Sequence, residues 1–310
     1  MEDDKALIEK YPPEPTKPLD TDCCGSGCST CVFDLYDLDM KKWRKRCDEI
    51  DENVVPCAII KDIISIYEFK YFKIIDINSI SSTVKIFTFQ IDGNRSLPLE
   101  CGQHIVARAH SVCGKTIIRP YTPVSKRTDK GYFKIAVKFY ESGEMSCCMR
   151  AWRVDNEIEW RGPFGEFIYK AKQYDMLLLL AGGTGVTPMI QIMHEVLDNE
   201  DDFTRIILFY SVREIKDMIL KDDMNEWNSY WNCDIVYCLT GDDRNIEKMK
   251  YGDKIHYGRI DSECLSSFIS EELPLSLKVL ICGSKCFNED MTKLVMNLYG
   301  IAKDKIHCFL

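Results

Sequence analysis

The segment Ile117 to Ser125, IIRPYTPVS, gathers more hydrogen-bonding side chains than a plain β-strand requires. Arg119 offers a planar fork of N–H donors that matches a phosphate group. Tyr121 offers a flat aromatic face, and Thr122 offers a short hydroxyl, as does the serine that ends the segment. The two prolines hold the chain extended. The segment therefore has the chemistry to bind a ligand with a phosphate and a flat ring, although an edge strand without a ligand is also compatible with it.

A glycine-rich stretch, AGGTGVTPM, covers Ala181 to Met189 between an apolar run and a helical pattern. Glycines let the backbone approach an anion, and the first turn of a helix offers unpaired N–H groups. Pro188 suits that first turn. The stretch is not G-x-G-x-x-G, so it does not predict the standard dinucleotide fingerprint. A second anion site or a plain strand–helix turn fits it equally well.

A third candidate is ESGEMSCCMRAW, from Glu141 to Trp152. A glycine turn there is followed by Met145 and Ser146, which begin a predicted helix. The same helix-terminus argument predicts an anion site, and an ordinary capped helix is the alternative.

Two kinds of sequence pattern surround these candidate sites. Between about residues 67 and 169, short alternating strands such as VKIFTFQI, HIVARAH and YFKIAVKFY are separated by turn residues, which indicates an antiparallel barrel. From residue 173 onward, apolar runs such as MLLLLAGG alternate with helical patterns such as TPMIQIMHEVL and NEDMTKLVMNLYG. A helix is also predicted over MNEWNSYW. Strands that alternate with helices predict an α/β domain with a parallel sheet.

The N-terminal part differs in composition from both of these regions. Residues 1–18 form a proline-rich tail, and residues 19–56 form a Cys-rich module with four cysteines, namely Cys23, Cys24, Cys28 and Cys31. This thiolate set has the count for zinc or an iron–sulfur cluster, and a reduced turn without a metal is the alternative. The following KKWRKRCDEIDE predicts a solvated helix.

Composition excludes several classes of function. The net charge is −9, and residues 1–56 contain 14 acidic and 8 basic residues, a net of −6, so a nucleic-acid partner is not expected. No apolar run reaches the length of a membrane span, and the acidic N-terminus is unlike a secretory signal. The sixteen cysteines are then expected to be reduced. We expect a soluble, cytoplasmic monomer.

Five motifs occur in one order along the chain: RPYTPVS, GEMS, RGPFGEF, AGGTGVTPM and ICGS. In this combination the sequence resembles the NADH–cytochrome b5 reductase branch of the ferredoxin-reductase-like flavoproteins over residues 65–310. The stretch CCGSGCSTCVFDLY resembles a short oxidoreductase-like domain found before some such reductases.

The resemblance implies a Greek-key FAD-binding barrel over residues 65–172 and an NAD-binding α/β domain over residues 173–310. It places Thr122 and Cys282 at the catalytic centre. The implied cofactor-binding residues are Arg119, Pro120, Tyr121, Thr122, Ser125, Val137, Lys138, Tyr140, Gly143, Met145, Ser146, Gly182, Gly183, Thr184, Thr187, Asp217, Cys282 and Gly283.

The implied reaction is the transfer of a hydride from NADH to FAD, followed by single electrons to a haem protein such as cytochrome b5. Asp217 favours NADH over NADPH, although Arg213 lies close to it in sequence. A basic patch at Lys126, Arg127 and Lys130 is the expected docking site for an acidic acceptor.

Two departures from the family support an alternative reading. Glu144 stands where the family commonly has lysine, and CGSKC replaces its proline-rich loop. The alternative is a metal-binding interaction protein whose reductase body is structural and poorly active.

Overall fold

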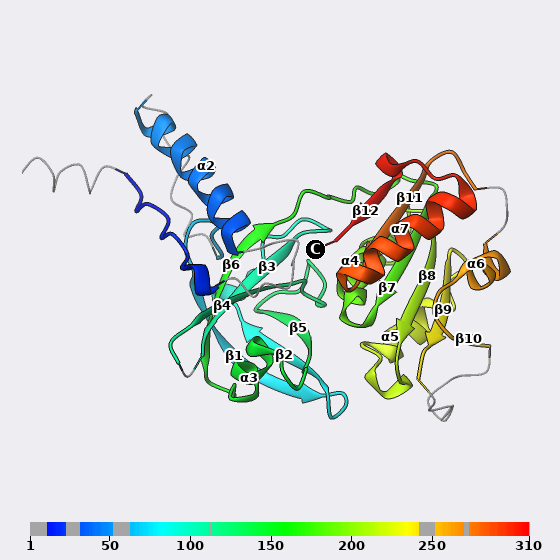
Figure 1. Cartoon of the computed structure of the whole chain (residues 1–310), viewed down its shortest axis with the longest axis horizontal. Coiled ribbons are helices and arrows are strands. Elements are labelled where there is room, and N and C mark those ends of the chain that lie inside the picture. The colour runs from blue at the N-terminus through cyan, green and yellow to red at the C-terminus, as the bar shows by residue number, and fades with distance from the viewer. Residues whose placement is uncertain are drawn as a thin grey trace, which may run out of the picture.

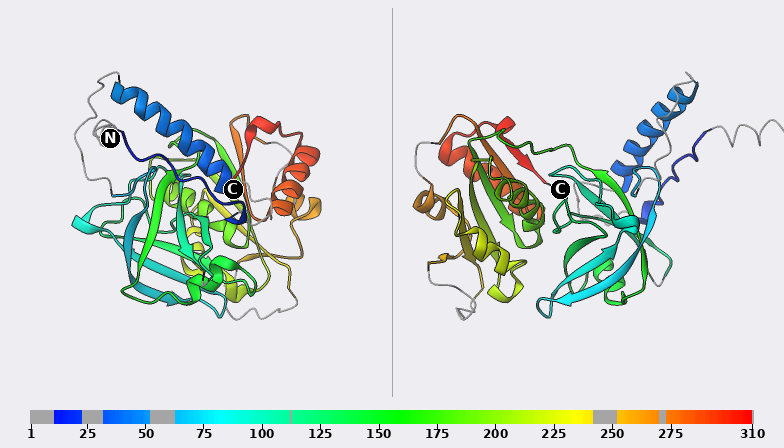
Figure 2. Two further views of the ribbon diagram at one scale, coloured as in Figure 1. Left: turned by 60° about the vertical axis from the view of Figure 1, so that its left-hand side comes forward. Right: turned by 180° about the vertical axis from the view of Figure 1, so that it is seen from behind.

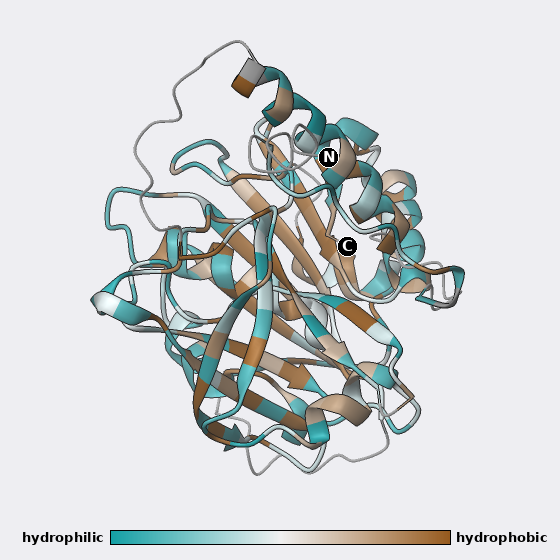
Figure 3. Cartoon of the chain, turned by 90° about the vertical axis from the view of Figure 1, so that its left-hand side faces the viewer, coloured by the Kyte–Doolittle hydropathy of each residue, from teal (hydrophilic) through white to brown (hydrophobic). Residues whose placement is uncertain are grey.

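The computed structural model describes residues 11–22, 32–51, 63–111, 113–241, 252–269 and 273–309. Within these ranges two bodies lie side by side, each built on a six-stranded sheet (Figure 1). The strands of both sheets carry long apolar segments, whereas many connecting loops are hydrophilic (Figure 3). The two bodies match the two sequence patterns.

The first body is antiparallel, with strand order β4-β3-β6-β1-β2-β5. In β6, buried side chains alternate with more exposed ones, as a pleated sheet with one covered face requires. The covered face packs around Trp160, Phe89 and Phe133. The predicted antiparallel barrel is confirmed. Its strands and helix are β1 (Lys70–Ser79), β2 (Val84–Gln90), β3 (His104–His110), β4 (Thr116–Tyr121), β5 (Tyr132–Lys138), α3 (Glu144–Arg150) and β6 (Glu157–Phe164), with a 3-10 turn η2 (Asp92–Asn94).

The second body is a parallel sheet in the order β10-β9-β8-β7-β11-β12. From Met176 to Ala181, every residue of β7 is buried, because helices cover both faces of a sheet of this kind. The predicted α/β domain is confirmed. Its elements are β7 (Met176–Gly182), η3 (Gly183–Gly185), α4 (Val186–Leu197), β8 (Arg205–Val212), η4 (Ile215–Asp217), α5 (Lys221–Trp227), β9 (Cys233–Leu239), β10 (Lys254–Tyr257), α6 (Ser262–Phe268), β11 (Leu277–Cys282), α7 (Lys285–Tyr299), η6 (Lys303–Lys305) and β12 (Ile306–Cys308).

The helix expected over MNEWNSYW begins and ends earlier in the structure than the sequence predicts. Helix α5 begins at Lys221 and ends at Trp227, and turns follow up to β9. The apolar anchors of α5 are Met224 and Trp227, which are both buried, whereas Trp231 is 75% exposed. Extending the helix through Trp231 would bury no further apolar side chain, so the chain turns instead.

The N-terminal helix is longer than the stretch predicted to be helical, and its first half packs against the barrel. Helix α2 (Val32–Asp51) follows the short turn η1 (Asp20–Asp22). Leu35 packs against Val106 and Phe164, and Asp39 forms a buried ion pair with Arg161 of β6. Figures 1 and 2 show that α2 begins beside the barrel body and that its other end projects away from it. The solvated helix expected over KKWRKRCDEIDE is the second half of α2, where none of the described side chains is buried, whereas Leu35 and Asp39 lie in the first half, before that stretch.

Two predictions from the sequence meet the limits of the described residues. Cys23, Cys24, Cys28 and Cys31 lie outside the described ranges. Within those ranges, no cluster of three or more His, Cys, Asp or Glu side chains is arranged to hold a metal ion. None of the helices described there has both the length and the apolar character that crossing a membrane requires.

Candidate active site

The order of the parallel sheet fixes where a ligand can bind. The chain passes from β7 to β8, β9 and β10 on one side, and then returns to place β11 and β12 on the other side of β7. Ligands of such sheets bind beyond the carboxyl ends of the strands, at the point where the direction of winding reverses. The glycine-rich turn after β7 lies at that point and faces the barrel.

The first cavity lies between the barrel and this turn and has a volume of about 440 Å³. The barrel contributes the end of β4, the end of β5 and the beginning of α3, and the parallel sheet contributes the turns after β7 and β11. Its wall residues are His104, Arg119, Pro120, Tyr121, Thr122, Ala136, Val137, Lys138, Tyr140, Gly143, Glu144, Met145, Ser146, Gly182, Thr184, Gly185, Thr187, Pro188, Cys282, Gly283, Ser284 and Phe309.

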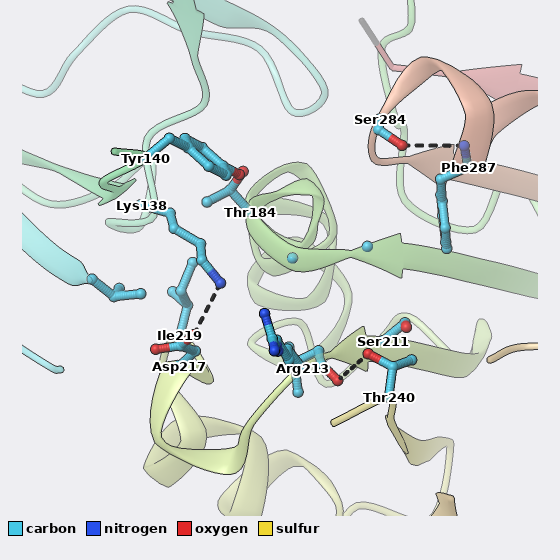
Figure 4. Close-up of a pocket in the computed structure, with 14 residues that line it drawn as sticks. Lys138, Tyr140, Thr184, Ser211, Arg213, Asp217, Ile219, Thr240, Ser284 and Phe287 are labelled. Atoms are coloured by element: carbon cyan, nitrogen blue, oxygen red, sulfur yellow. Dashed lines mark hydrogen bonds and ion pairs between the residues drawn. The ribbon is translucent and has the colours of Figure 1, made fainter. Parts of the chain in front are cut away.

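The second cavity, of about 270 Å³, adjoins the first and extends along the carboxyl ends of β8 and β9 (Figure 4). The two cavities share part of their wall. The residues that line both are Lys138, Tyr140, Gly182, Thr184 and Ser284. The other wall residues are Val84, Gly183, Ser211, Val212, Arg213, Asp217, Ile219, Thr240 and Phe287. Two ligands, one in each cavity, would meet at this shared wall.

The glycine-rich turn is shaped by close backbone contact. A Cβ on Gly185 would lie 2.1 Å from the carbonyl oxygen of Cys282, so the turns after β7 and β11 touch without space for a side chain. Gly183 has φ +56°, and a methyl group placed there would meet open space. Glycine is favoured at this position because of its backbone conformation rather than because of a steric contact. Glycine therefore serves two different purposes within three residues.

The phosphate-type chemistry predicted at Arg119 is present on the wall of the first cavity. Its Nη1 donates to the carbonyl oxygen of Ile118 at 2.8 Å, and its Nη2 lies 4.0 Å from Oε2 of Glu144. Glu144 is itself paired with Lys115, whose Nζ lies 2.8 Å from Oε1. A carboxylate thus stands among the cations of this cavity.

The ring and hydroxyl groups of the same motif divide between two environments. Tyr121 packs edge-on against Trp160 with ring centroids 5.7 Å apart, and its hydroxyl donates to the sulfur of Met149. Thr122 lines the first cavity. Ser125 is not one of the described residues that line the two cavities. Its buried hydroxyl instead accepts a hydrogen bond from the backbone N–H of Lys134 at 3.0 Å.

Two titratable groups on the wall are neutral near pH 7. Burial lowers the pKa of His104 to about 4, so the imidazole is uncharged. Its Nε2 is buried and has no hydrogen-bond partner among the described residues. Burial also raises the pKa of the Cys282 thiol to about 12, so the thiol stays protonated and is a weak hydrogen-bond donor rather than a nucleophile.

Asp217 joins the two bodies at the edge of the second cavity. Its carboxylate accepts from Lys138 at 2.9 Å, from Thr83 at 2.8 Å and from Ser81 at 2.9 Å, all three from the barrel (Figure 4 shows the Lys138 contact). Burial acts to raise the pKa of Asp217, but these hydrogen bonds outweigh it and leave the pKa below its ordinary value. The carboxylate is therefore already engaged by protein groups.

We expect Asp217→Asn to lower the free energy of unfolding by about 2 kcal/mol at pH 7, because it breaks a buried charge pair. The folded-state pKa is depressed, so the stabilisation is present above the unfolded pKa of about 4 and is lost as the pH falls through the folded pKa. Urea unfolding at pH 7 and at successively lower pH should show the difference shrinking. Asp222→Asn, an exposed change on α5, is the control, and an equal loss in both variants would contradict the assignment.

Apart from Ser125, every cofactor-binding residue expected from the sequence lines one of the two cavities. The sequence reasoning missed His104, Ser211, Thr240, Phe287 and Phe309. Ser211 and Thr240 carry a usable signal, since they lie at the carboxyl ends of β8 and β9. The other three reach the cavities only through the tertiary fold.

Known proteins resemble this chain in both sequence and fold. A family model described as "Oxidoreductase FAD-binding domain" matches residues 71–169, one described as "Oxidoreductase NAD-binding domain" matches residues 179–293, and one described as "Oxidoreductase-like protein, N-terminal" matches residues 9–52. The fold resembles the cytochrome b5 reductase domain of Ulva prolifera nitrate reductase, with TM-score 0.71 and 22% identity over 80% of this chain and 99% of that chain. It also resembles a ferredoxin NADP+ reductase from Neisseria gonorrhoeae, with TM-score 0.64 and 18% identity over 78% and 98%.

The fold, the two adjoining cavities and the two domain matches define an FAD- and NAD-binding oxidoreductase. The chain is 34% identical to a mouse protein named NADH-cytochrome b5 reductase-like, over 96% of this chain and 95% of that protein. It is 33% identical to the human protein of the same name over 95% and 94%. The chain belongs to this family of NADH-cytochrome b5 reductase-like proteins.

The residues of the first cavity fit FAD. Arg119 provides the donor fork that a pyrophosphate requires. A Cβ on Gly143 would lie 2.9 Å from Oγ of Ser146, so the chain turns tightly where a phosphate would approach the backbone. Of the wall residues in the described part of the chain, Glu144 is the one whose charge opposes an anion.

Proposed function

We propose that the chain transfers electrons from NADH to FAD and then, one at a time, to a haem protein such as cytochrome b5. The observation that supports this most strongly is the pair of adjoining cavities, since a flat ring in the first can face a nicotinamide that enters through the second. FAD, when bound, accepts a hydride from NADH and releases single electrons. The protein's part is to bind, align and shield the two rings.

In this proposal the barrel residues hold FAD within residues 65–172. Arg119 binds the pyrophosphate, the ring of Tyr121 packs against the flavin, and Thr122 hydrogen-bonds to the ring edge. The second cavity within residues 173–310 receives NADH, and Cys282 with Gly283 flanks the nicotinamide. Phe309 and Phe287 line the walls and limit the access of water.

The nucleotide preference rests on charge at the second cavity. Asp217 pairs with Lys138 on the wall of this cavity, so Lys138 offers no free positive charge to an additional 2′-phosphate, which favours NADH over NADPH. Arg213, whose side chain points toward the middle of the cavity in Figure 4, acts in the opposite direction and limits the preference. We therefore expect NADH to be favoured by about tenfold rather than by several orders of magnitude.

The basic patch expected from the sequence as the docking site for the acceptor is largely paired with acidic residues. Lys126 pairs with Asp198 at 2.8 Å, and Arg127 pairs with Glu195 at 2.9 Å. These pairs neutralise two of the three cations of that patch, so it offers little attraction to an acidic protein. The acceptor is supported instead by the family, whose members are named for cytochrome b5 reductase.

The test is steady-state oxidation of NADH with two acceptors. Ferricyanide is a small acceptor that needs no protein docking, and cytochrome b5 needs it. We expect turnover with both acceptors. Turnover with ferricyanide alone would remove cytochrome b5 as the acceptor, and no turnover with either would contradict the reductase proposal.

A further inference from the structure

Glu144 places a negative charge where the first cavity otherwise collects positive charge. It is the first residue of α3, it lines the cavity, and its side chain is 43% exposed. Its two carboxylate oxygens face different cations. Oε1 accepts from Nζ of Lys115 at 2.8 Å, and Oε2 lies 4.0 Å from Nη2 of Arg119.

The guanidinium of Arg119 is accordingly turned toward protein groups on two sides. One nitrogen donates to the carbonyl oxygen of Ile118, and the other faces Glu144. Lys115 comes from the turn before β4, so Glu144 links this turn to α3 across the edge of the cavity. One carboxylate therefore orients Arg119, which lines the cavity, and Lys115, which lies behind Glu144 and outside the cavity wall.

An entering pyrophosphate must therefore compete with Glu144. To pair with a phosphate oxygen, Arg119 has to move away from the carboxylate, and Glu144 then remains beside an added anion. Charges of like sign at such distances repel at the effective dielectric of a protein surface. The repulsion is screened by salt, because all three side chains are partly exposed.

We propose that Glu144, held by Lys115, is an internal competitor of the FAD pyrophosphate for Arg119, which makes FAD an exchangeable cofactor in this chain. This inference rests on the proposed function, because it takes the first cavity as the FAD site. The same arrangement sets the affinity for FAD without contacting the reacting rings, so its effect falls on binding rather than on the transfer of electrons.

The chain offers a matched control three residues away. Glu141 is exposed and lies outside both cavities, so Glu141→Lys makes the same change of charge without touching Arg119 or Lys115. The dissociation constant of FAD is measured from flavin fluorescence as each apoprotein is titrated, at low and at high NaCl concentration. We expect Glu144→Lys to tighten FAD binding about tenfold at low salt and Glu144→Gln about threefold, with Glu141→Lys close to wild type.

Added salt should reduce the gain of Glu144→Lys, because the interaction is electrostatic. Equal dissociation constants for Glu144→Lys, Glu144→Gln and Glu141→Lys would overturn the inference, as would weaker binding in both Glu144 variants. If Glu144→Lys does not fold, Glu144→Gln decides the matter alone. Failure of wild type and both Glu144 variants to bind FAD at all would instead overturn the proposed function, and with it this inference.

Discussion

Gly185→Ala is expected to destabilise the parallel-sheet body by about 3 kcal/mol, because a side chain there overpacks a rigid contact. The new Cβ would lie 2.1 Å from the carbonyl oxygen and 2.4 Å from the carbonyl carbon of Cys282. These are backbone atoms of the strand end that also forms the cavity wall, so no rotamer change relieves the contact. We also expect the variant to lose reduction by NADH, since the turns after β7 and β11 have to separate.

Gly183→Ala is the control for this change. Gly183 belongs to the same turn and has φ +56°, but a Cβ added there would have no atom within 4 Å. The cost is then only that of a left-handed backbone, about 1 kcal/mol. Urea unfolding of both variants measures the difference. Similar losses in the two variants would contradict the claim that steric contact with Cys282 is what requires glycine at position 185.

Arg119→Ala is expected to weaken FAD binding about a hundredfold, because it removes charge-assisted hydrogen bonds to the pyrophosphate. Stability should change little, since in the free protein Arg119 makes a hydrogen bond to the neighbouring carbonyl oxygen of Ile118 and a partly exposed contact with Glu144 at 4.0 Å. Titration of the apoprotein with FAD gives the affinity, and urea unfolding gives the stability.

Arg119→Lys separates the charge of this residue from its shape. Lysine keeps the positive charge but loses the planar fork, so we expect an intermediate loss of affinity of about tenfold. If Arg119→Ala binds FAD as tightly as wild type, the pyrophosphate does not bind at this arginine. If Arg119→Lys binds no better than Arg119→Ala, the fork rather than the charge accounts for the whole effect.

Most of the fold could be predicted from patterns in the local sequence. The buried run of β7 and the alternation along β6 show how many faces of each sheet are covered, and this property can be read from neighbouring residues in the sequence. The short strand β12, with three residues, has too few positions for a period to appear. It forms because Val279 to Ile281 of β11 offer a free edge, which only the assembled sheet provides.

The candidate site likewise combines residues that local motifs predict with residues that only the tertiary fold brings together. Arg119 and Tyr121 lie in one short motif and the glycine turn forms another, so residue types and spacing within each motif predicted these residues. Lys115 and Glu144 are 29 positions apart, and their pairing depends on how α3 sits beside the turn before β4. Phe309 reaches the first cavity only because β12 joins the sheet next to β11. Such contacts carry no signal in the local sequence.

The central claim is that NADH reduces FAD held in the first cavity, and an anaerobic visible spectrum tests it most directly. The purified protein is loaded with FAD, freed of excess, and titrated with NADH and separately with NADPH. We predict that stoichiometric NADH bleaches the flavin absorbance, that NADPH does so less effectively, and that Gly185→Ala does not respond. A protein that binds FAD but whose spectrum neither nucleotide changes would contradict the account.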